Sequence, residues 1–586
     1  MNPDKRITEI IKTPLKLIKE IHENSASSTR ASHLTISNSF KEVFSNQESI
    51  YKIPSITNPS TSPSSLPKST LVRFRCMIQD TGLGKEIYSN QNLTSIYQES
   101  HHEEFDPTLN SNESQFQLQE RELIYSVEIP GESDWLKQKL DGPIDKGIEF
   151  NLMNTMDLSS SSETDFHKNE DQSKLSSTRD KFPLKGQQHL GVLLKVYDED
   201  QKFEIDSIKT HSAIEVVGIL DWIDFEMPLW LKLILITLPR FRFNSNTEED
   251  IIPKQNPDDI QTKKDLIPCI HVIFHHSIPN LVISDPMTSN PIEECEKIRS
   301  RLIRYIAHKA FNNDELAAEY LLCSIISNAP SDTKLSIPNE TLQLNLVYKT
   351  SSPSPESLIA LLSKLLTRTV TVPFDIPTLN SNRLFPISNE DQIVSGSLQL
   401  TSTTQVILNS MNMNEGTLNS LGVKNIGCLK SLIEDRTLLY QFPFNQFFLN
   451  LSLGFIVLSF ESKSFLEGFW NLPVVIEKES RGFVEEPDEF EIQLWREYIQ
   501  NSIQNLKSIK ISDELSSKIQ ESFVNIRKGA KDLTEANERL SLNEFSNRLK
   551  LLKLIGTQLN TTELNWSNWE YVCKLEKVRK IRCSNH

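Results

Sequence analysis

The chain has 586 residues, 38% of them hydrophobic, and a formal net charge of −16 at pH 7. Its length is enough for roughly three or four domains. The acidic balance argues against nonspecific nucleic-acid binding as the main activity, because neutralising phosphates requires a basic surface. With 17 glycines and 28 prolines, the chain also has little material for a glycine-rich cofactor loop.

Targeting and redox features predict a soluble intracellular protein without a membrane partner. The seven cysteines form no C-x-x-C pair, which is typical of reduced thiols in the cytosol or nucleus. Met1–Glu23 lacks the apolar core of a signal peptide. The most apolar run, Leu229–Leu238, is interrupted by Lys232 and is about half of the ~20 residues that a membrane-spanning helix needs.

Residues 1–66 are predicted to form an N-terminal helical arm and a Ser/Pro-rich linker. Residues 24–68 are dense in Ser, Thr, Asn and Pro. We interpret them as a linker or weakly ordered arm, with a short helix around Phe40–Phe44.

Residues 67–288 are predicted to form one β-rich domain. From Leu71 the residues alternate, with Val72, Phe74, Cys76 and Ile78 on one face and two arginines, Arg73 and Arg75, on the other. Further strand-like runs are Leu123–Ile129, Val192–Tyr197, Ile214–Leu220 and Ile270–Phe274. Polar inserts near 100–118, 155–180 and 242–264 are expected to be disordered.

The remaining chain divides into an α/β region, 289–484, and a helical region, 485–586. Helical periodicity begins at Ile292 and continues in Asp314–Ile326. Strands are then predicted at Leu342–Val347, Gln405–Leu408 and Leu451–Phe460. After Pro487 the pattern is almost wholly helical and includes a capping box at Ser541–Glu544.

One strand, loop and helix in the α/β region occupies the place of a nucleotide pocket. Leu342, Leu344 and Leu346 alternate with polar residues as in a half-buried strand, and an apolar-periodic helix follows, started by Glu356 and Ser357. The loop over 348–355 contains no glycine and has two prolines, unlike a P-loop. A carboxylate at the helix start would also repel phosphate. We therefore expect no nucleotide cofactor.

Two other motifs favour ordinary structural interpretations. Thr81–Lys85 resembles a fragment of a P-loop but has Glu86 after the lysine, so a turn between strands is favoured. His271, His275 and His276 suggest a metal site, but no Cys or acidic residue at suitable spacing completes it. We expect them on a sheet surface and predict no metal site.

The sequence contains none of the common catalytic motifs, and we expect neither a catalytic residue nor a small-molecule substrate. Trp566 and Trp569 are interpreted as core residues or as a partner-binding anchor. A basic run near the C-terminus can be a nuclear import signal, a solvated helix face or a cation-rich helix end. Its residues are Lys574, Lys577, Arg579, Lys580 and Arg582.

Several motifs resemble those of the minichromosome maintenance (MCM) complex-binding protein family. Leu71–Asp80 resembles its opening signature, Leu316–Leu322 its "LAAEYLL" helix, and Val394–Leu400 its "VSGLLQL" segment. Nearer the C-terminus, three segments are similar to its "YREYL", "FVDMRK" and "WDQWE": Trp495–Ile499, Phe523–Lys528 and Trp566–Glu570. The matches have the same order as in the family and cover most of 68–582.

The resemblance implies an α/β multidomain fold: an OB-like β domain, a degenerate AAA+-like α/β domain and a helical lid-like end. It implies a nuclear, non-enzymatic factor that binds MCM helicase subunits and meets chromatin indirectly. The implied roles are MCM assembly or unloading in DNA replication and the cell cycle, and sister-chromatid cohesion before cell division. Where MCM helicases have a Walker B Asp-Glu pair, this chain has Asn409 and Ser410, which cannot supply metal-binding carboxylates. The alternatives are a degenerate helicase-like ATPase and a single-strand nucleic-acid-binding OB protein.

Overall fold

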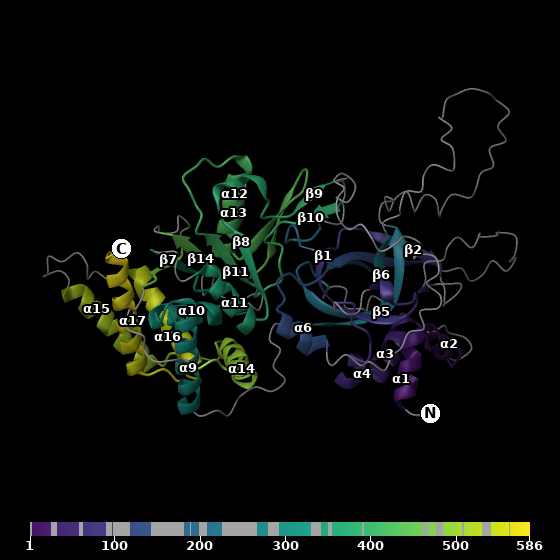
Figure 1. The fold of residues 1–586 in the computed structure, drawn as a ribbon, viewed down its shortest axis with the longest axis horizontal. Coiled ribbons are helices and arrows are strands. Elements are labelled where there is room, and N and C mark those ends of the chain that lie inside the picture. The colour runs from purple at the N-terminus through teal and green to yellow at the C-terminus, as the bar shows by residue number, and fades with distance from the viewer. Residues whose placement is uncertain are drawn as a thin grey trace, which may run out of the picture. The chain divides into compact units, whose positions relative to one another are not determined.

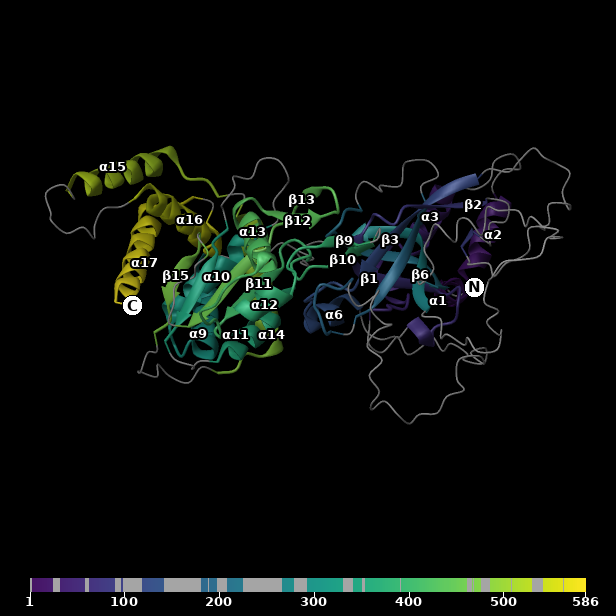
Figure 2. The same ribbon diagram turned by 90° about the horizontal axis from the view of Figure 1, so that it is seen from above.

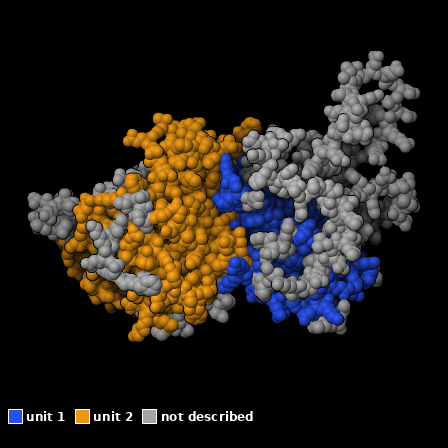
Figure 3. Space-filling view, in the orientation of Figure 1, with its two compact units in different colours: residues 1–129, 138–278, 388–395 blue, residues 130–137, 279–387, 396–586 orange. Residues whose placement is uncertain are grey.

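The computed structural model divides the chain into two compact units, each described here by itself (Figure 3). Unit 1 comprises 1–129, 138–278 and 388–395; unit 2 comprises 130–137, 279–387 and 396–586. The structure describes residues 3–24, 32–57, 63–89, 96–97, 118–141, 181–187, 189–197, 208–224, 266–278, 292–329, 341–349, 354–389, 392–460, 466, 468–475, 485–506, 509–529, 541–561 and 563–585. The three predicted polar inserts lie almost wholly outside these residues.

The centre of unit 1 is a ring of five strands. They are β1 (Leu71–Asp80), β3 (Leu118–Val127), β4 (Gly191–Tyr197), β5 (Ala213–Asp224) and β6 (Leu266–Ser277). Their order is β1-β5-β6-β4-β3, and β3 also pairs with β1, which closes the ring. The β4–β6 pair is parallel and the other pairs are antiparallel. A sixth strand, β2 (Lys85–Ser89), pairs with β3.

The predicted strands of this region are confirmed, and their alternation sets the inside of the barrel. Val72, Phe74, Cys76 and Ile78 are fully buried and share one apolar cluster with residues from the other four strands. Because every strand of the ring contributes to this cluster, it is the interior of the barrel. Thr81–Gly84 connects β1 to β2, as the turn interpretation predicted.

The N-terminal helices pack on the outside of the barrel, which corrects the interpretation of 24–68 as a linker. The helices are α1 (Pro3–Lys12), α2 (Pro14–Asn24), α3 (His33–Val43) and α4 (Gln47–Tyr51), and a short 3-10 turn, η1 (Pro63–Ser65), follows them. Ile36, Phe40 and Phe44 are buried in one cluster with Val217 and Ile273 of the barrel. The spacing of these three apolar side chains puts them on one helix face, and that pattern outweighs the Ser-rich composition.

Unit 2 is built on a parallel sheet of five strands with helices on both sides (Figures 1 and 2). The strand order is β15 (Trp470–Pro473), β7 (Leu344–Tyr348), β14 (Gly454–Phe460), β11 (Gln405–Ser410) and β8 (Thr369–Pro373). The helices of this region are α9 (Ile292–Ala310), α10 (Glu315–Ser327), α11 (Pro355–Leu365), α12 (Ile376–Ser381) and α13 (Ser420–Glu434).

The strand β7 is buried along its whole length and not half-buried as predicted. It has parallel neighbours on both edges, β15 and β14, and strands of such sheets are covered on both faces. The polar residue that suggested a solvated face, Asn345, bonds Asn471 and Ser459 of the two neighbouring strands. A short cross-strand polar chain therefore takes the place of solvent.

The helices that the structure describes after residue 485 agree with the helical pattern that the sequence predicted. They are α14 (Glu489–Asn505), α15 (Asp513–Gly529), α16 (Leu542–Gln558) and α17 (Trp566–Ser584), and the predicted capping box between Ser541 and Glu544 is present. Trp495, Leu552 and Trp569 belong to the same buried cluster as the sheet strands. The division of the chain at 66, 288 and 484 stays a prediction.

Each unit also incorporates a segment from elsewhere in the chain. In unit 2, Ser133 donates its backbone N–H to Thr367 O (3.0 Å) and Trp135 donates Nε1–H to Leu366 O (3.1 Å). In unit 1, the backbone N–H of Ile393 bonds Asp80 (3.1 Å). The short strands β9 (Ile387–Asn389) and β10 (Gln392–Val394) lie at this second segment, and the helix α6 (Asp134–Asp141) at the first.

Two statements hold for the described residues only. No helix among them is long and apolar enough to cross a membrane. All seven cysteines are described, none is in a disulfide, and five are buried.

Substitutions of the two C-terminal tryptophans should change stability by very different amounts. Trp569 is 2% exposed and Trp566 is 37% exposed, with its Nε1–H bonded to Glu570. Trp569→Ala should lower the free energy of unfolding by about 3–5 kcal/mol, because it empties a core position. The matched variant Trp566→Ala should change it by less than about 1 kcal/mol. Chemical denaturation of both variants checks this, and equal losses would contradict the assignment.

Candidate functional sites in the barrel and the parallel sheet

The first candidate site is the carboxyl edge of the parallel sheet in unit 2. Because β7, β14 and β11 are parallel, their carboxyl ends, Tyr348, Phe460 and Ser410, lie at one edge. Ligands of open α/β sheets bind at this edge, next to helix N-termini. A nucleotide would therefore have to be held by the residues that follow these strands.

The helix that follows β7 has few backbone donors left for phosphate. It begins at Pro355, one residue before the predicted Glu356, and proline has no N–H. The next two N–H groups, of Glu356 and Ser357, both bond Ser354, one through its hydroxyl and one through its carbonyl. The carboxylate of Glu356 lies in the same first turn. Residues 350–353 of the loop lie outside the described part of the chain.

The end of β11 lacks the chemistry to hold a metal or to activate water. The Oδ1 of Asn409 accepts a hydrogen bond from Met411 N (3.2 Å), and the hydroxyl of Ser410 donates to Leu458 O of β14 (2.8 Å). Both side chains are therefore used in local structure. No cluster of three or more His, Cys, Asp or Glu residues among the described residues could hold a metal ion.

A buried carboxylate lies close to the end of β7. Asp314 is fully buried and caps α10 by accepting a bond from Ala317 N (3.1 Å). Burial and the Asp314 charge raise the pKa of the Tyr348 phenol. The charge of this carboxylate is paired with Arg582 of α17 (2.6 Å), so Asp314 serves the fold rather than an open site.

The basic run at the C-terminus is partly used in packing. Arg579 bonds Glu576 and Asn471 O, Lys580 pairs with Glu544, and Arg582 pairs with Asp314. Lys574 and Lys577 are exposed. Only Arg582 lies in the last turn of α17, as the helix-end interpretation expects, while Arg579 and Lys580 are used in ion pairs and Lys574 and Lys577 fit a solvated face.

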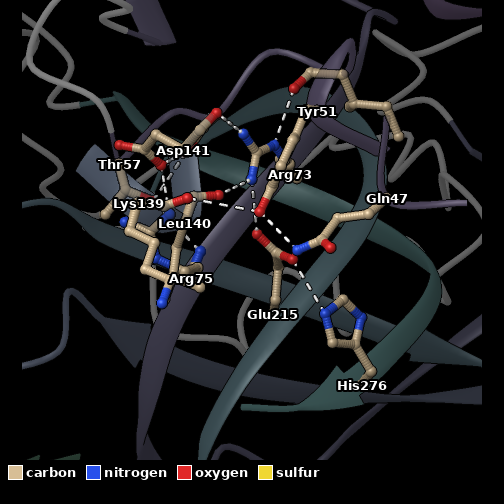
Figure 4. Close-up of polar contacts among 12 residues, drawn as sticks. Gln47, Tyr51, Thr57, Arg73, Arg75, Lys139, Leu140, Asp141, Glu215 and His276 are labelled. Atoms are coloured by element: carbon tan, nitrogen blue, oxygen red, sulfur yellow. Dashed lines mark hydrogen bonds and ion pairs between the residues drawn. The ribbon is translucent and has the colours of Figure 1, made fainter. Parts of the chain in front are cut away.

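The second candidate site is a buried charge cluster on β1 in unit 1 (Figure 4). Sequence analysis placed Arg73 and Arg75 opposite the apolar face, and the structure shows that both are 1% exposed. Arg73 pairs with Glu215 (Oε1 at 3.1 Å), and Arg75 pairs with Asp141. The signal in the sequence was two arginines within an apolar strand, since a fully buried arginine needs partners.

The remaining contacts of Arg73 are with backbone carbonyls. Its Nε donates to Ile53 O (3.0 Å), and its Nη atoms donate to Leu140 O and Asp141 O. The last two carbonyls end α6, where the helix dipole is negative. Figure 4 shows Tyr51 beside the same guanidinium, at 5.3 Å from ring centroid to Cζ. The cluster therefore joins β1, α6 and the chain before β1.

The acidic partner Glu215 is kept ionised. Burial by itself would raise its pKa, but the hydrogen bond from His276 (3.0 Å) and the charge of Arg73 lower it below the ordinary value. All of these charges are matched inside the protein, and this cluster is best explained as structural support.

A third cluster, of histidines and tyrosines, lies between the barrel and α3. His271 is fully buried, so the predicted surface position is wrong for this residue, whereas His276 is exposed. Nδ1 of His271 lies 2.7 Å from the hydroxyl of Tyr197, and Nδ1 of His33 lies 2.8 Å from that of Tyr97. These contacts hold both rings without a metal.

The cluster contains cations that disfavour a charged histidine. Burial and the neighbouring Arg121 and Lys195 lower the pKa of His271 well below its ordinary value. Burial lowers the pKa of His33 to about 3. Both cations pair with Glu86. Sequence reasoning missed His33 because nothing in the sequence places α3 against the barrel.

Comparisons with known proteins agree with the sequence resemblance. The family described as mini-chromosome maintenance replisome factor matches residues 40–155 and 150–583. The mini-chromosome maintenance complex-binding protein of Danio rerio is 24% identical over 605 residues, covering 88% of this chain and 89% of the relative. The protein of the same name from Arabidopsis thaliana is 23% identical over 589 residues, covering 93% and 92%. That of Drosophila melanogaster is 25% identical over 579 residues, covering 88% and 90%.

The two buried histidines predict a loss of stability in mild acid. In the unfolded chain each histidine binds a proton near pH 6.5, whereas the lowered pKa values keep both neutral in the folded protein until a much lower pH. Stability is therefore full above pH 6.5 and falls as the pH drops, by up to about 1.4 kcal/mol per pH unit for each histidine. Urea unfolding between pH 7 and pH 5 measures this slope.

The variant His33→Gln isolates one of the two histidines. It removes one titrating group and keeps a polar side chain that can bond Tyr97. The slope between pH 6 and pH 5 should fall by up to about 1.4 kcal/mol per pH unit. An unchanged slope would show that His33 is not buried in the neutral form.

Proposed function

Because this chain belongs to the mini-chromosome maintenance replisome factor family, we propose that it is a nuclear, non-catalytic factor that binds subunits of the MCM helicase. The observation that carries the proposal is the near full-length similarity to proteins named as MCM complex-binding proteins in animals and a plant. We further propose that it acts in MCM assembly or unloading on chromatin during DNA replication, and in sister-chromatid cohesion.

The barrel of unit 1 supports an OB-like assignment. An OB-fold is a five-stranded Greek-key barrel, and unit 1 has a ring of five strands with one parallel pair. Such barrels bind oligonucleotides in many proteins, but a net charge of −16 favours a protein partner over a nucleic acid. The OB-like domain is therefore proposed as a scaffold of the binding factor.

The parallel sheet of unit 2 supports an AAA+-like assignment without ATPase chemistry. It contains the strand, loop and helix on which a P-loop is built, here β7 and α11. Ser354 occupies the donors at the helix start, and Asn409 and Ser410 stand where carboxylates are needed. The helices α14–α17 correspond to the lid-like region in this proposal. An ATPase-like body that cannot use ATP can still present its surface to MCM subunits.

The proposal predicts that the purified full chain binds no nucleotide. Addition of Mg-ATP should leave its melting temperature unchanged, and phosphate release should equal that of a buffer blank. Both follow because the first helix N–H groups are already bonded and no carboxylate is present at 409 or 410. Micromolar binding of Mg-ATP would instead favour the degenerate ATPase.

Affinity purification tests the partner directly. The tagged full chain, expressed in cells of its own organism, should enrich MCM subunits at least about tenfold over an untagged control, read by mass spectrometry. We expect the contacts to lie in 290–586. Surface variants in the full chain are preferable to truncation there, because unit 2 also contains 130–137. Absence of every MCM subunit from the purified material would refute the proposed function.

A further inference from the structure

A hairpin in unit 2 exposes an unusual number of aromatic side chains. It consists of β12 (Thr437–Gln441) and β13 (Gln446–Asn450), and Figure 2 shows it beside α13. At its tip Phe444 is 96% exposed, and on β13 Phe447 and Phe448 are 52% and 54% exposed. All five residues of β13 are exposed. A cluster of large apolar side chains on a surface marks an interaction site.

The hairpin is anchored in the fold on one side only. Leu438, Leu439 and Tyr440 of β12 are buried, and the Tyr440 hydroxyl accepts a bond from Gln399 (2.9 Å). β13 pairs with β12 in unbroken antiparallel register. Among the described residues, no strand pairs with the outer edge of β13. The exposed strand is therefore held firmly by β12 and is open on its other edge.

The hydrogen-bond pattern shows which backbone groups this open edge presents. At the turn, Phe442 N bonds Asn445 O (2.8 Å), whereas Gln441 N bonds Pro386 O, away from β13 (3.0 Å). Pairs in an antiparallel ladder alternate between bonded and non-bonded. Along β13 the residues that point their N–H and C=O groups outward are therefore Gln446, Phe448 and Asn450.

The residues of β13 themselves carry no feature that usually protects an edge strand. Natural edges are blocked by lysines, prolines, bulges or a covering element. β13 has no lysine, no proline and no bulge. A short β-prone segment without charge is an aggregation hazard when it is left open. An edge of this kind is compatible with a stable protein when a partner covers it.

The charge of the hairpin selects the kind of partner. Residues 437–450 contain no Asp, Glu, Lys, Arg or His. A nucleic acid would need cations beside its phosphates, and these residues supply none. A second copy of the chain would bring another −16 of net charge, which opposes self-association. The hairpin therefore fits an uncharged, apolar segment of a different protein.

We propose that β13 is a docking edge to which an extended apolar segment of a protein partner adds as a further β-strand. In this mode the main-chain bonds provide affinity, and pockets for alternate side chains provide specificity. Phe448 lies at the centre of the edge, and Phe444 and Phe447 flank it with apolar surface. The inference rests on the proposed function for its choice of partner, an MCM subunit.

The experiment measures binding of purified MCM subunits to the immobilised full chain. Phe448→Pro removes the central outward N–H, and Phe448→Val keeps it while shortening the side chain. Phe444→Ser tests the apolar tip. Phe490→Ser is the matched control, because Phe490 is 79% exposed on α14 of the same unit. Thermal melting confirms that each variant is folded.

Strand addition predicts a graded result. Phe448→Pro should weaken binding at least about tenfold, because a tenfold change in affinity is about the contribution of one main-chain hydrogen bond. Phe448→Val keeps that bond and should weaken binding only about two- to threefold. Phe444→Ser should weaken binding, and Phe490→Ser should not. Equal binding by the wild-type chain and all hairpin variants would overturn the docking edge and leave the proposed function intact. No binding by the wild-type chain would overturn both.

Two further measurements assign the edge to another occupant if the proposal is wrong. A concentration-dependent dimer that Phe448→Pro abolishes, seen by light scattering, would assign β13 to a second copy. Binding of a 30-nucleotide oligo(dT) that Phe444→Ser abolishes would assign the tip to nucleic acid. Either result would overturn the proposal.

Discussion

The pairing of two buried arginines with Asp141 and Glu215 fixes the end of α6 against β1 within unit 1. Arg73 and Arg75 lie on β1, and the carbonyls that Arg73 binds end α6. Residues 130–137, which precede this end of α6, belong to unit 2. Removing one member would leave a buried charge without its partner, which costs about 3–5 kcal/mol in comparable pairs. The position of the last turn of α6 depends on these pairs.

A comparable role in unit 2 belongs to Asp314. Its carboxylate caps α10, accepts the backbone N–H of Val475 after β15, and pairs with Arg582 of the last helix. One buried side chain thus joins the sheet, an early helix and the C-terminal helix.

At the carboxyl edge of the parallel sheet in unit 2, the polar groups described at 354–357 and 409–410 are used in local hydrogen bonds. At the start of α11, Ser354 accepts bonds from the next N–H groups; at the end of β11, Asn409 accepts a bond from Met411 N and Ser410 donates to Leu458 O of β14. This unit can contact other molecules through its surface. In the β12–β13 hairpin of this unit, exposed aromatic side chains and a strand edge unpaired among the described residues occur together.

The sequence by itself determined the strands of the barrel and the helices after 485, because both depend on local patterns; the strands β8, β12, β13 and β15 were not predicted. Alternation placed the strands of the barrel, and the loop over 348–355 lacked glycine. Which polar residues are buried was decided by tertiary structure. The sequence placed Arg73 only on the face opposite the apolar one and His271 on a sheet surface, whereas partners from distant strands and helices bury both. The same holds for Trp566 and Trp569, which are three positions apart on one helix. Only the packing of α16 and α17 against the sheet shows which tryptophan faces the core, because burial depends on neighbours that are far away in the sequence.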